Sequence, residues 1–156
     1  MILYRISNFA DLAGLGGELA DGRWHTREKG KRVVYTSDHP ALCILEVLVH
    51  NFESKDEMPD TYQLLRIDVP DSLIESVDAR TKVQAGVDTM PLTQEIGDRW
   101  LRAAQKGGLL VPSVLVPAAQ NCILNSKLPE IASIRPEVIG RFPFDKRLLA
   151  GPTSQL

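Results

Sequence analysis

The chain has 156 residues, of which 44% are hydrophobic and 24% are charged, and its net charge is −2. This length suits one domain with its own buried core, so we expect a single domain over residues 1–156. The slightly acidic balance argues against direct contact with nucleic acid, and the absence of an apolar run of about 18 residues argues against a membrane span.

The cysteines and histidines give no sign of a metal site. Cys43 and Cys122 each lie in a short apolar run, which is typical of buried free thiols. The three histidines lack metal-ligand spacing, and no Cys-x-x-Cys occurs. The first residues carry no charged leader before a long apolar stretch, so we expect a cytoplasmic protein without a metal.

The order of the elements favours an α+β fold. The glycine-rich residues 11–22 and the polar residues 53–60 are expected to be loops, residues 71–92 carry weak signals, and residues 142–148 suit a final strand or a docking segment. We predict helices over 40–50 and 93–106, the second capped by Thr93. We predict strands over 2–6, 32–36, 62–69, 121–126 and 131–135, with two strand pieces within 109–117. Strands outnumber helices and do not alternate with them, unlike in a doubly wound sheet.

Glu46 is the most informative polar residue, because apolar residues surround it in the expected helix over 40–50. A carboxylate in a buried helix needs a partner, a shifted pKa or access to a cleft. The spacing leaves a second interpretation open, in which His39, Glu46, His50 and Glu53 form a narrow solvated stripe.

Two arginines are candidates for binding an anion. Arg5 lies inside the first expected strand, where its side chain either points to solvent or aims at a phosphate or carboxylate. Arg23 follows the glycine-rich segment and precedes Trp24, so a cation and a flat ring lie beside each other, as a nucleotide would require. A loop arginine packed on an exposed tryptophan is the alternative.

Three further polar side chains have both a structural and a functional interpretation. Tyr35 ends a strand, where it either packs or contacts a ligand ring. Ser113 interrupts an apolar strand, but no Gly-x-Ser-x-Gly surrounds it, so we do not expect a nucleophile. Asn121 is either a turn residue or a polar contact near the site.

Read in chain order, these residues belong to motifs that resemble the RES domain family, named for an arginine, a glutamate and a serine. The matching stretches are residues 3–6 (Leu-Tyr-Arg-Ile), 22–24 (Gly-Arg-Trp), 34–37 (Val-Tyr-Thr-Ser), 45–47 (Leu-Glu-Val) with His50 behind them, 97–101 (Gly-Asp-Arg-Trp-Leu), 111–113 (Val-Pro-Ser), 121–125 (Asn-Cys-Ile-Leu-Asn) and 142–148 (Phe-Pro-Phe-Asp-Lys-Arg-Leu). The sequence departs from the family at His25, where asparagine is usual.

The resemblance implies a curled, split sheet flanked by helices, similar to that of the ADP-ribosyltransferases. It also implies a toxin that is covered at its active site by an Xre-type helix-turn-helix antitoxin, with a homodimer within that complex as a further option. Such toxins degrade NAD+ by hydrolysis or phosphorolysis, so the substrates would be NAD+ with water or inorganic phosphate. Two alternatives stay open: a protein ADP-ribosyltransferase and a non-catalytic binding domain.

The resemblance also assigns roles. Glu46, Arg5, Tyr35 and Ser113 match the catalytic set. The expected NAD+-binding residues are Arg5, Arg23, Trp24, Tyr35, Ser113 and Asn121. In this hypothesis Glu46 stabilises the positive charge that develops on the ribose, and the two arginines bind the pyrophosphate.

Overall fold

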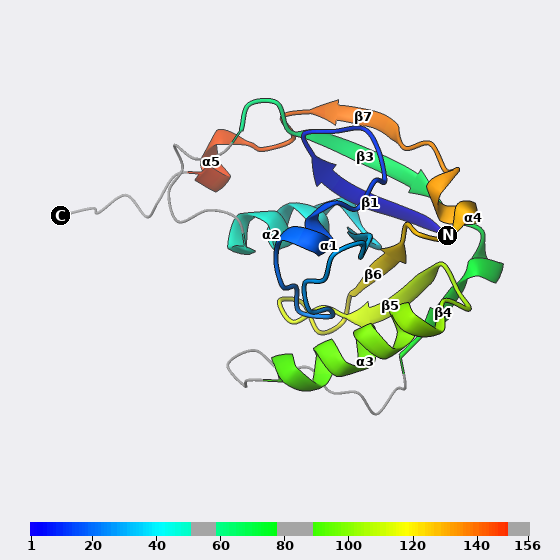
Figure 1. Ribbon diagram of the computed structural model, residues 1–156. Helices are drawn as coiled ribbons and strands as arrows, with labels where there is room; N and C mark the ends of the chain where they lie inside the picture. The colour runs from blue at the N-terminus through cyan, green and yellow to red at the C-terminus, as the bar shows by residue number, and fades with distance from the viewer. Residues whose placement is uncertain (51–58, 78–88, 150–156) are drawn as a thin grey trace.

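The computed structural model describes residues 1–50, 59–77 and 89–149, which form a seven-stranded open sheet with helices packed beside it (Figure 1). The strand order is β4-β5-β6-β2-β1-β3-β7. The elements in chain order are β1 (Ile2–Ser7), α1 (Gly16–Leu19), β2 (Val33–Ser37), α2 (Pro40–His50), β3 (Gln63–Asp68), the short 3-10 helix η2 (Asp71–Leu73), β4 (Ile74–Ser76), α3 (Met90–Ala103), β5 (Gly108–Pro112), β6 (Gln120–Asn125), α4 (Pro129–Ala132), β7 (Glu137–Arg141) and α5 (Lys146–Leu149).

The sheet is split near its middle. β1 and β2 are aligned at one residue pair, Tyr4 with Ser37, whereas β1 and β3 are aligned over six pairs. The pairings are antiparallel except that of β4 with β5. The expected α+β class, with a split sheet flanked by helices, is therefore confirmed.

The helices cover different parts of the sheet (Figure 1). α2 begins at Pro40, where a missing N–H costs no helical hydrogen bond, and packs against β1 and β2 through Cys43 and Ile44. α3 lies along β5 through Trp100. The largest core cluster contains Leu3, Leu12, Val34, Ile67, Val69, Cys122, Leu124 and Ile131. Neighbouring residues Val33 and Val34 belong to different clusters, as the alternation of a strand requires.

Several predicted elements are wrong in type. The strand predicted over 131–135 is replaced by α4, and β7 follows it where no strand was predicted. Leu128 is extended, and the fixed φ of Pro129 suits the first turn of a helix, so this short stretch forms a helix and not a strand. The tail over 142–148, for which a final strand or a docking segment was predicted, leads into α5, and the glycine-rich segment contains α1.

Other predictions are wrong in their boundaries. α3 begins at Met90, with Thr89 at its N-cap and Pro91 in its first turn, so Thr93 lies inside the helix and does not cap it. It ends before Ala104, which adopts the left-handed conformation. β5 is one strand that ends at Pro112, while η2 and β4 arise within 71–92. Most of the predicted 53–60 loop falls outside the described residues. Among those residues, no helix has the length and apolarity to cross a membrane.

Candidate active site

The carboxylate of Glu46 is held in place by side chains from two strands. Its Oε1 accepts hydrogen bonds from Asn121 Nδ2 at 2.6 Å and from Ser113 Oγ at 2.9 Å. Glu46 lies on α2, Asn121 on β6 and Ser113 directly after β5, so three elements meet at one oxygen. The Glu46 side chain is 19% exposed, which does not fit a freely solvated stripe.

Ser113 can contribute only a donor to Glu46. Its hydroxyl oxygen already accepts the backbone N–H groups of Leu115 and Val116, each at 3.1 Å. Ser113 is fully buried, so its one O–H is directed to the carboxylate. A serine used in this way is not a nucleophile, in agreement with the missing elbow motif.

The other oxygen, Glu46 Oε2, lies 3.2 Å from His50 Nε2, one helical turn further along α2. Burial raises the pKa of Glu46, but hydrogen bonds from His50, Asn121 and Ser113 outweigh it and bring the pKa below its usual 4.5. The hydrogen bond to Glu46 raises the pKa of His50, although burial and the charge of Arg23 oppose this. Glu46 is therefore ionised at neutral pH, and it has one oxygen bound twice and one facing a half-exposed imidazole.

Arg5 is a half-buried cation without a carboxylate partner among the described residues. Its Nη1 donates to the Tyr35 carbonyl oxygen over a long 3.5 Å, and its Nε is buried with no acceptor in the described residues. Burial lowers the pKa of Arg5, and Cys43 and Asp11 contribute smaller opposing effects. The charges of Arg5 and Glu46 both act on the pKa of the Cys43 thiol, Arg5 lowering it and Glu46 raising it. A guanidinium with unused donors in this position can bind an anion.

Arg23 is positioned by α3. Thr93 Oγ1 donates to the Arg23 carbonyl oxygen at 2.6 Å, and Gln94 Nε2 donates to the Gly22 carbonyl oxygen at 3.0 Å. The Arg23 guanidinium reaches Thr89 Oγ1 at 3.4 Å and has no ion pair in the described part of the chain. Its charge lowers the pKa of both His50 and Tyr35.

The Tyr35 hydroxyl has two hydrogen-bonding partners within the protein. It accepts the Trp24 backbone N–H at 3.1 Å and lies 2.8 Å from His25 Nδ1. Burial lowers the pKa of His25 and raises that of Tyr35, so both are neutral, and the histidine tautomer decides which of the two donates in their hydrogen bond. Gly22 packs so closely on this pair that an added Cβ would overlap the Tyr35 oxygen. The Tyr35 hydroxyl is therefore held against Trp24 and His25.

Trp24 lies in the hydrophobic core and not on an open surface. It is 3% exposed and packs with Val33, Trp100 and Ile123. The structure thus brings Glu46, Ser113 and Asn121 into direct contact, whereas the Arg5 and Arg23 guanidinium groups bond to Tyr35 and Thr89. The Trp24 ring is buried away from solvent, and the residue contacts Tyr35 through its backbone N–H.

Sequence reasoning missed three supporting residues. Ser37, at the end of β2, donates to Asn121 Oδ1 at 2.8 Å and is 3% exposed. Asp98 binds Thr26 and Lys31, and Gly97 lets α3 approach the Trp24 carbonyl, where a Cβ would overlap it. The motif over 97–101 contained both α3 residues, so a signal was present, but only the fold shows what they hold.

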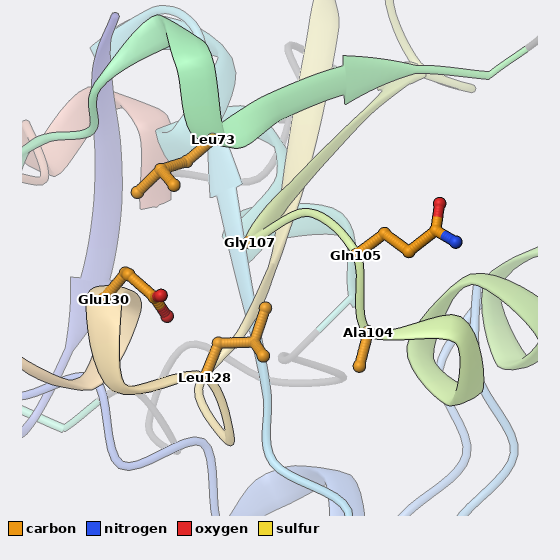
Figure 2. Close-up of a pocket in the computed structure, with 6 residues that line it drawn as sticks. All are labelled: Leu73, Ala104, Gln105, Gly107, Leu128 and Glu130. Atoms are coloured by element: carbon orange, nitrogen blue, oxygen red, sulfur yellow. The ribbon is translucent and has the colours of Figure 1, made fainter.

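A pocket elsewhere on the molecule shares none of these residues (Figure 2). It lies beyond the end of α3, and its lining includes Ala104, Gly107, Leu128 and Glu130. Within the described residues, no group of three or more His, Cys, Asp or Glu side chains is arranged to bind a metal ion.

Comparisons with known proteins show the family and the fold of the chain. The RES domain family model matches residues 2–145. "Toxin Res" from Pseudomonas putida is 38% identical over 149 residues, which cover 95% of this chain and 99% of the relative. "Prs ADP-ribosylating toxin" from a Sphingobium species is 31% identical over 144 residues, covering 89% and 87%. The solved M. tuberculosis MbcT–MbcA toxin–antitoxin complex contains a chain of similar fold, with a TM-score of 0.64 and 18% identity over 87% of this chain and 80% of that one.

The fold and the site together define an α+β domain of the toxin type, in which an acid on a helix meets strand-end donors. The chain belongs to the RES domain family. The expectation of a RES-domain toxin, drawn from the order of the motifs, is confirmed.

Proposed function

We propose that this toxin is an enzyme that degrades NAD+ by cleaving the bond between nicotinamide and ribose, with Glu46 as the essential charge. The arrangement of Glu46 carries the proposal: the carboxylate is ionised, its Oε1 is held by two donors, and its Oε2 faces His50. The relative that carries the name ADP-ribosylating toxin supports chemistry at this bond of NAD+.

The chemistry requires a negative charge more than an acid. Nicotinamide in NAD+ is cationic, so it leaves as a neutral molecule with the electron pair of the broken C–N bond. The ribose then develops positive charge, which a fixed carboxylate stabilises without rearranging. Because Oε1 is held by two donors and Oε2 by the half-exposed His50 alone, Oε2 is the oxygen that would face the ribose. Water or phosphate forms the new bond to the ribose carbon and releases its proton.

The two arginines would bind the pyrophosphate. Both have donors that no carboxylate of the described residues uses, and buried or half-buried guanidinium groups favour a planar anion. The Tyr35 ring would pack against the nicotinamide or ribose, while Ser113 and Asn121 would act on the substrate through Glu46.

Glu46→Gln tests the proposal. The amide oxygen of the glutamine can still accept from Ser113 and Asn121, so the fold is retained while the charge is lost. We expect NAD+ loss to fall by at least roughly 10²-fold, measured by chromatography of the products with the purified chain. The matched control is Glu95→Gln, an exposed acid on α3 that pairs with Arg99. Turnover retained in the Glu46 variant would disprove the proposed role.

The acceptor separates the two candidate reactions. The Sphingobium relative favours transfer of ADP-ribose to a protein as the second candidate. Incubation of the chain with NAD+, with and without phosphate, yields ADP-ribose or its phosphorylated form if the toxin is a hydrolase or phosphorylase. A transferase instead leaves a mass shift on a target protein, measured by mass spectrometry of a treated lysate.

We also propose that an Xre-type antitoxin covers this site. The MbcT–MbcA complex supports an antitoxin partner for proteins of this fold. On α2, Leu45 and Val49 are 42% and 59% exposed and directly precede Glu46 and His50 in the chain. An apolar strip beside a functional carboxylate suits a partner that buries both at once.

A further inference from the structure

Ser37 is the residue behind the Asn121 amide. It ends β2, and its Oγ lies 2.8 Å from Asn121 Oδ1, at the position where the two strands are in register. The other end of the same amide, Nδ2, lies 2.6 Å from Glu46 Oε1. Ser37 itself is 3% exposed, so bulk water does not compete for its hydrogen bond to Asn121. The hydroxyl and the carboxylate thus bind opposite ends of one amide.

We propose that Ser37 is a positioning residue of the active site: it fixes the Asn121 amide so that Nδ2 faces Glu46 Oε1 and Oε2 is left to the substrate. An ionised carboxylate only accepts hydrogen bonds, so the amide must present its NH₂ group. A reversed amide would set its carbonyl oxygen against the carboxylate. The Ser37 O–H favours the productive orientation because it supplies the donor that Oδ1 needs.

The neighbourhood of Ser37 supports this assignment. The Cys43 side chain lies within hydrogen-bonding reach of the same hydroxyl, and burial raises the pKa of that thiol to about 12, so it stays protonated. No charged side chain among the described residues forms a hydrogen bond with Ser37, which makes the amide its polar partner in the site. Ser37 therefore acts on Glu46 only through Asn121.

This inference rests on the proposed function, in which Glu46 is the essential charge. Ser37→Ala leaves Oδ1 buried without a donor and lets the amide turn. We expect kcat to fall about tenfold, the effect of one lost hydrogen bond, while the KM for NAD+ is unchanged. We also expect the pKa of Glu46 to rise, because one of the donors that lower it is no longer fixed.

The experiment compares three variants. Ser37→Ala removes the hydroxyl, Ser37→Thr restores it, and Thr36→Ala is the matched control. Thr36 is equally buried on β2 and donates at 2.7 Å to the Cys122 carbonyl oxygen, away from Glu46. The measurements are kcat and KM for NAD+, urea unfolding, and ¹³C NMR titration of the glutamate carboxyl groups, with the Glu46 signal assigned from Glu46→Gln.

The proposal predicts a lower kcat and a raised Glu46 pKa in Ser37→Ala, recovery of both in Ser37→Thr, and neither in Thr36→Ala. Wild-type kcat and titration in Ser37→Ala would overturn it, and so would equal changes in Thr36→Ala. If Ser37→Ala does not fold, Ser37→Cys keeps the volume with a weaker donor and must shift both quantities in the same direction. If the wild-type chain leaves NAD+ intact, the proposed function fails, while the titration still decides the role of Ser37.

Discussion

Asp98 binds Thr26 and Lys31, which lie in the segment that follows Arg23, so we expect Asp98→Ala to lower the free energy of unfolding. Its carboxylate accepts from Lys31 Nζ at 2.8 Å, from Thr26 Oγ1 at 2.6 Å and from the Thr26 backbone N–H. The Asp98 and Lys31 side chains are each 10% exposed. Breaking a buried pair costs about 3–5 kcal/mol. In Asp98→Ala, Lys31 keeps the Thr26 carbonyl and Glu28, so we expect the lower end, about 3 kcal/mol.

For a domain of this size, about 3 kcal/mol corresponds to a Tm that is lower by roughly 6–12 °C. Burial raises the pKa of Asp98, but Lys31 and Thr26 outweigh it and bring the pKa below 3.8. The sign follows: the contribution is complete above the unfolded pKa and is lost as pH falls through the lower folded value. The deficit of Asp98→Ala should therefore be constant near neutral pH and shrink in acid.

Urea unfolding of Asp98→Ala, Lys31→Met and the double variant measures the pair directly, because the cycle isolates the coupling energy. A deficit below about 1 kcal/mol at neutral pH would refute the claim that this pair is buried and strong. A deficit that stays constant in acid would refute the assignment to the charge of Asp98.

Two further predictions concern the surroundings of Glu46. Arg5→Met should leave the Tm unchanged or higher, because an apolar chain replaces a half-buried cation that has no carboxylate partner among the described residues. The same variant should raise the KM for NAD+ at least tenfold. A large loss of stability in thermal unfolding would contradict the first expectation. Leu45→Glu should weaken binding of the co-expressed antitoxin by roughly 10–100-fold in a pull-down titration and leave NAD+ loss unchanged, since it removes one exposed apolar contact beside the site. If Leu45→Glu binds the antitoxin as tightly as the wild type does, the antitoxin does not contact α2 at this residue.

The sequence predicted the elements with strong local patterns. β2 is rich in β-branched residues, and α2 begins at a proline after a polar turn, so both were found nearly at their observed bounds. β7 and α4 were not found, because β7 is an exposed edge strand held by its pairing with β3, and a four-residue helix has little periodicity. Thr93 looked like a cap but donates from within α3 to the Arg23 carbonyl, which no local pattern reveals.

The candidate site was predictable by residue type and by family order, but not by geometry. Glu46 attracted attention because an acid in an apolar helix needs partners, and Ser113 and Asn121 are those partners. Each donates one hydrogen bond to the carboxylate, which the sequence could not show. Ser37 belonged to the matching stretch over 34–37, but a serine at the end of a strand is also a common helix cap, so its bond to Asn121 was not predicted.

The split of the sheet connects the fold to this chemistry. Because β1 and β2 are aligned only at Tyr4 and Ser37, the Tyr35 carbonyl is not covered by a continuous ladder, and the Arg5 guanidinium reaches it. The same opening gives α2 room to lie against both strands, which brings Glu46 to the ends of β5 and β6. In a fully paired sheet a backbone N–H would bond to the Tyr35 carbonyl oxygen, and the Arg5 guanidinium would lose this acceptor. The unpaired cation and the held acid are thus consequences of one irregularity in strand pairing.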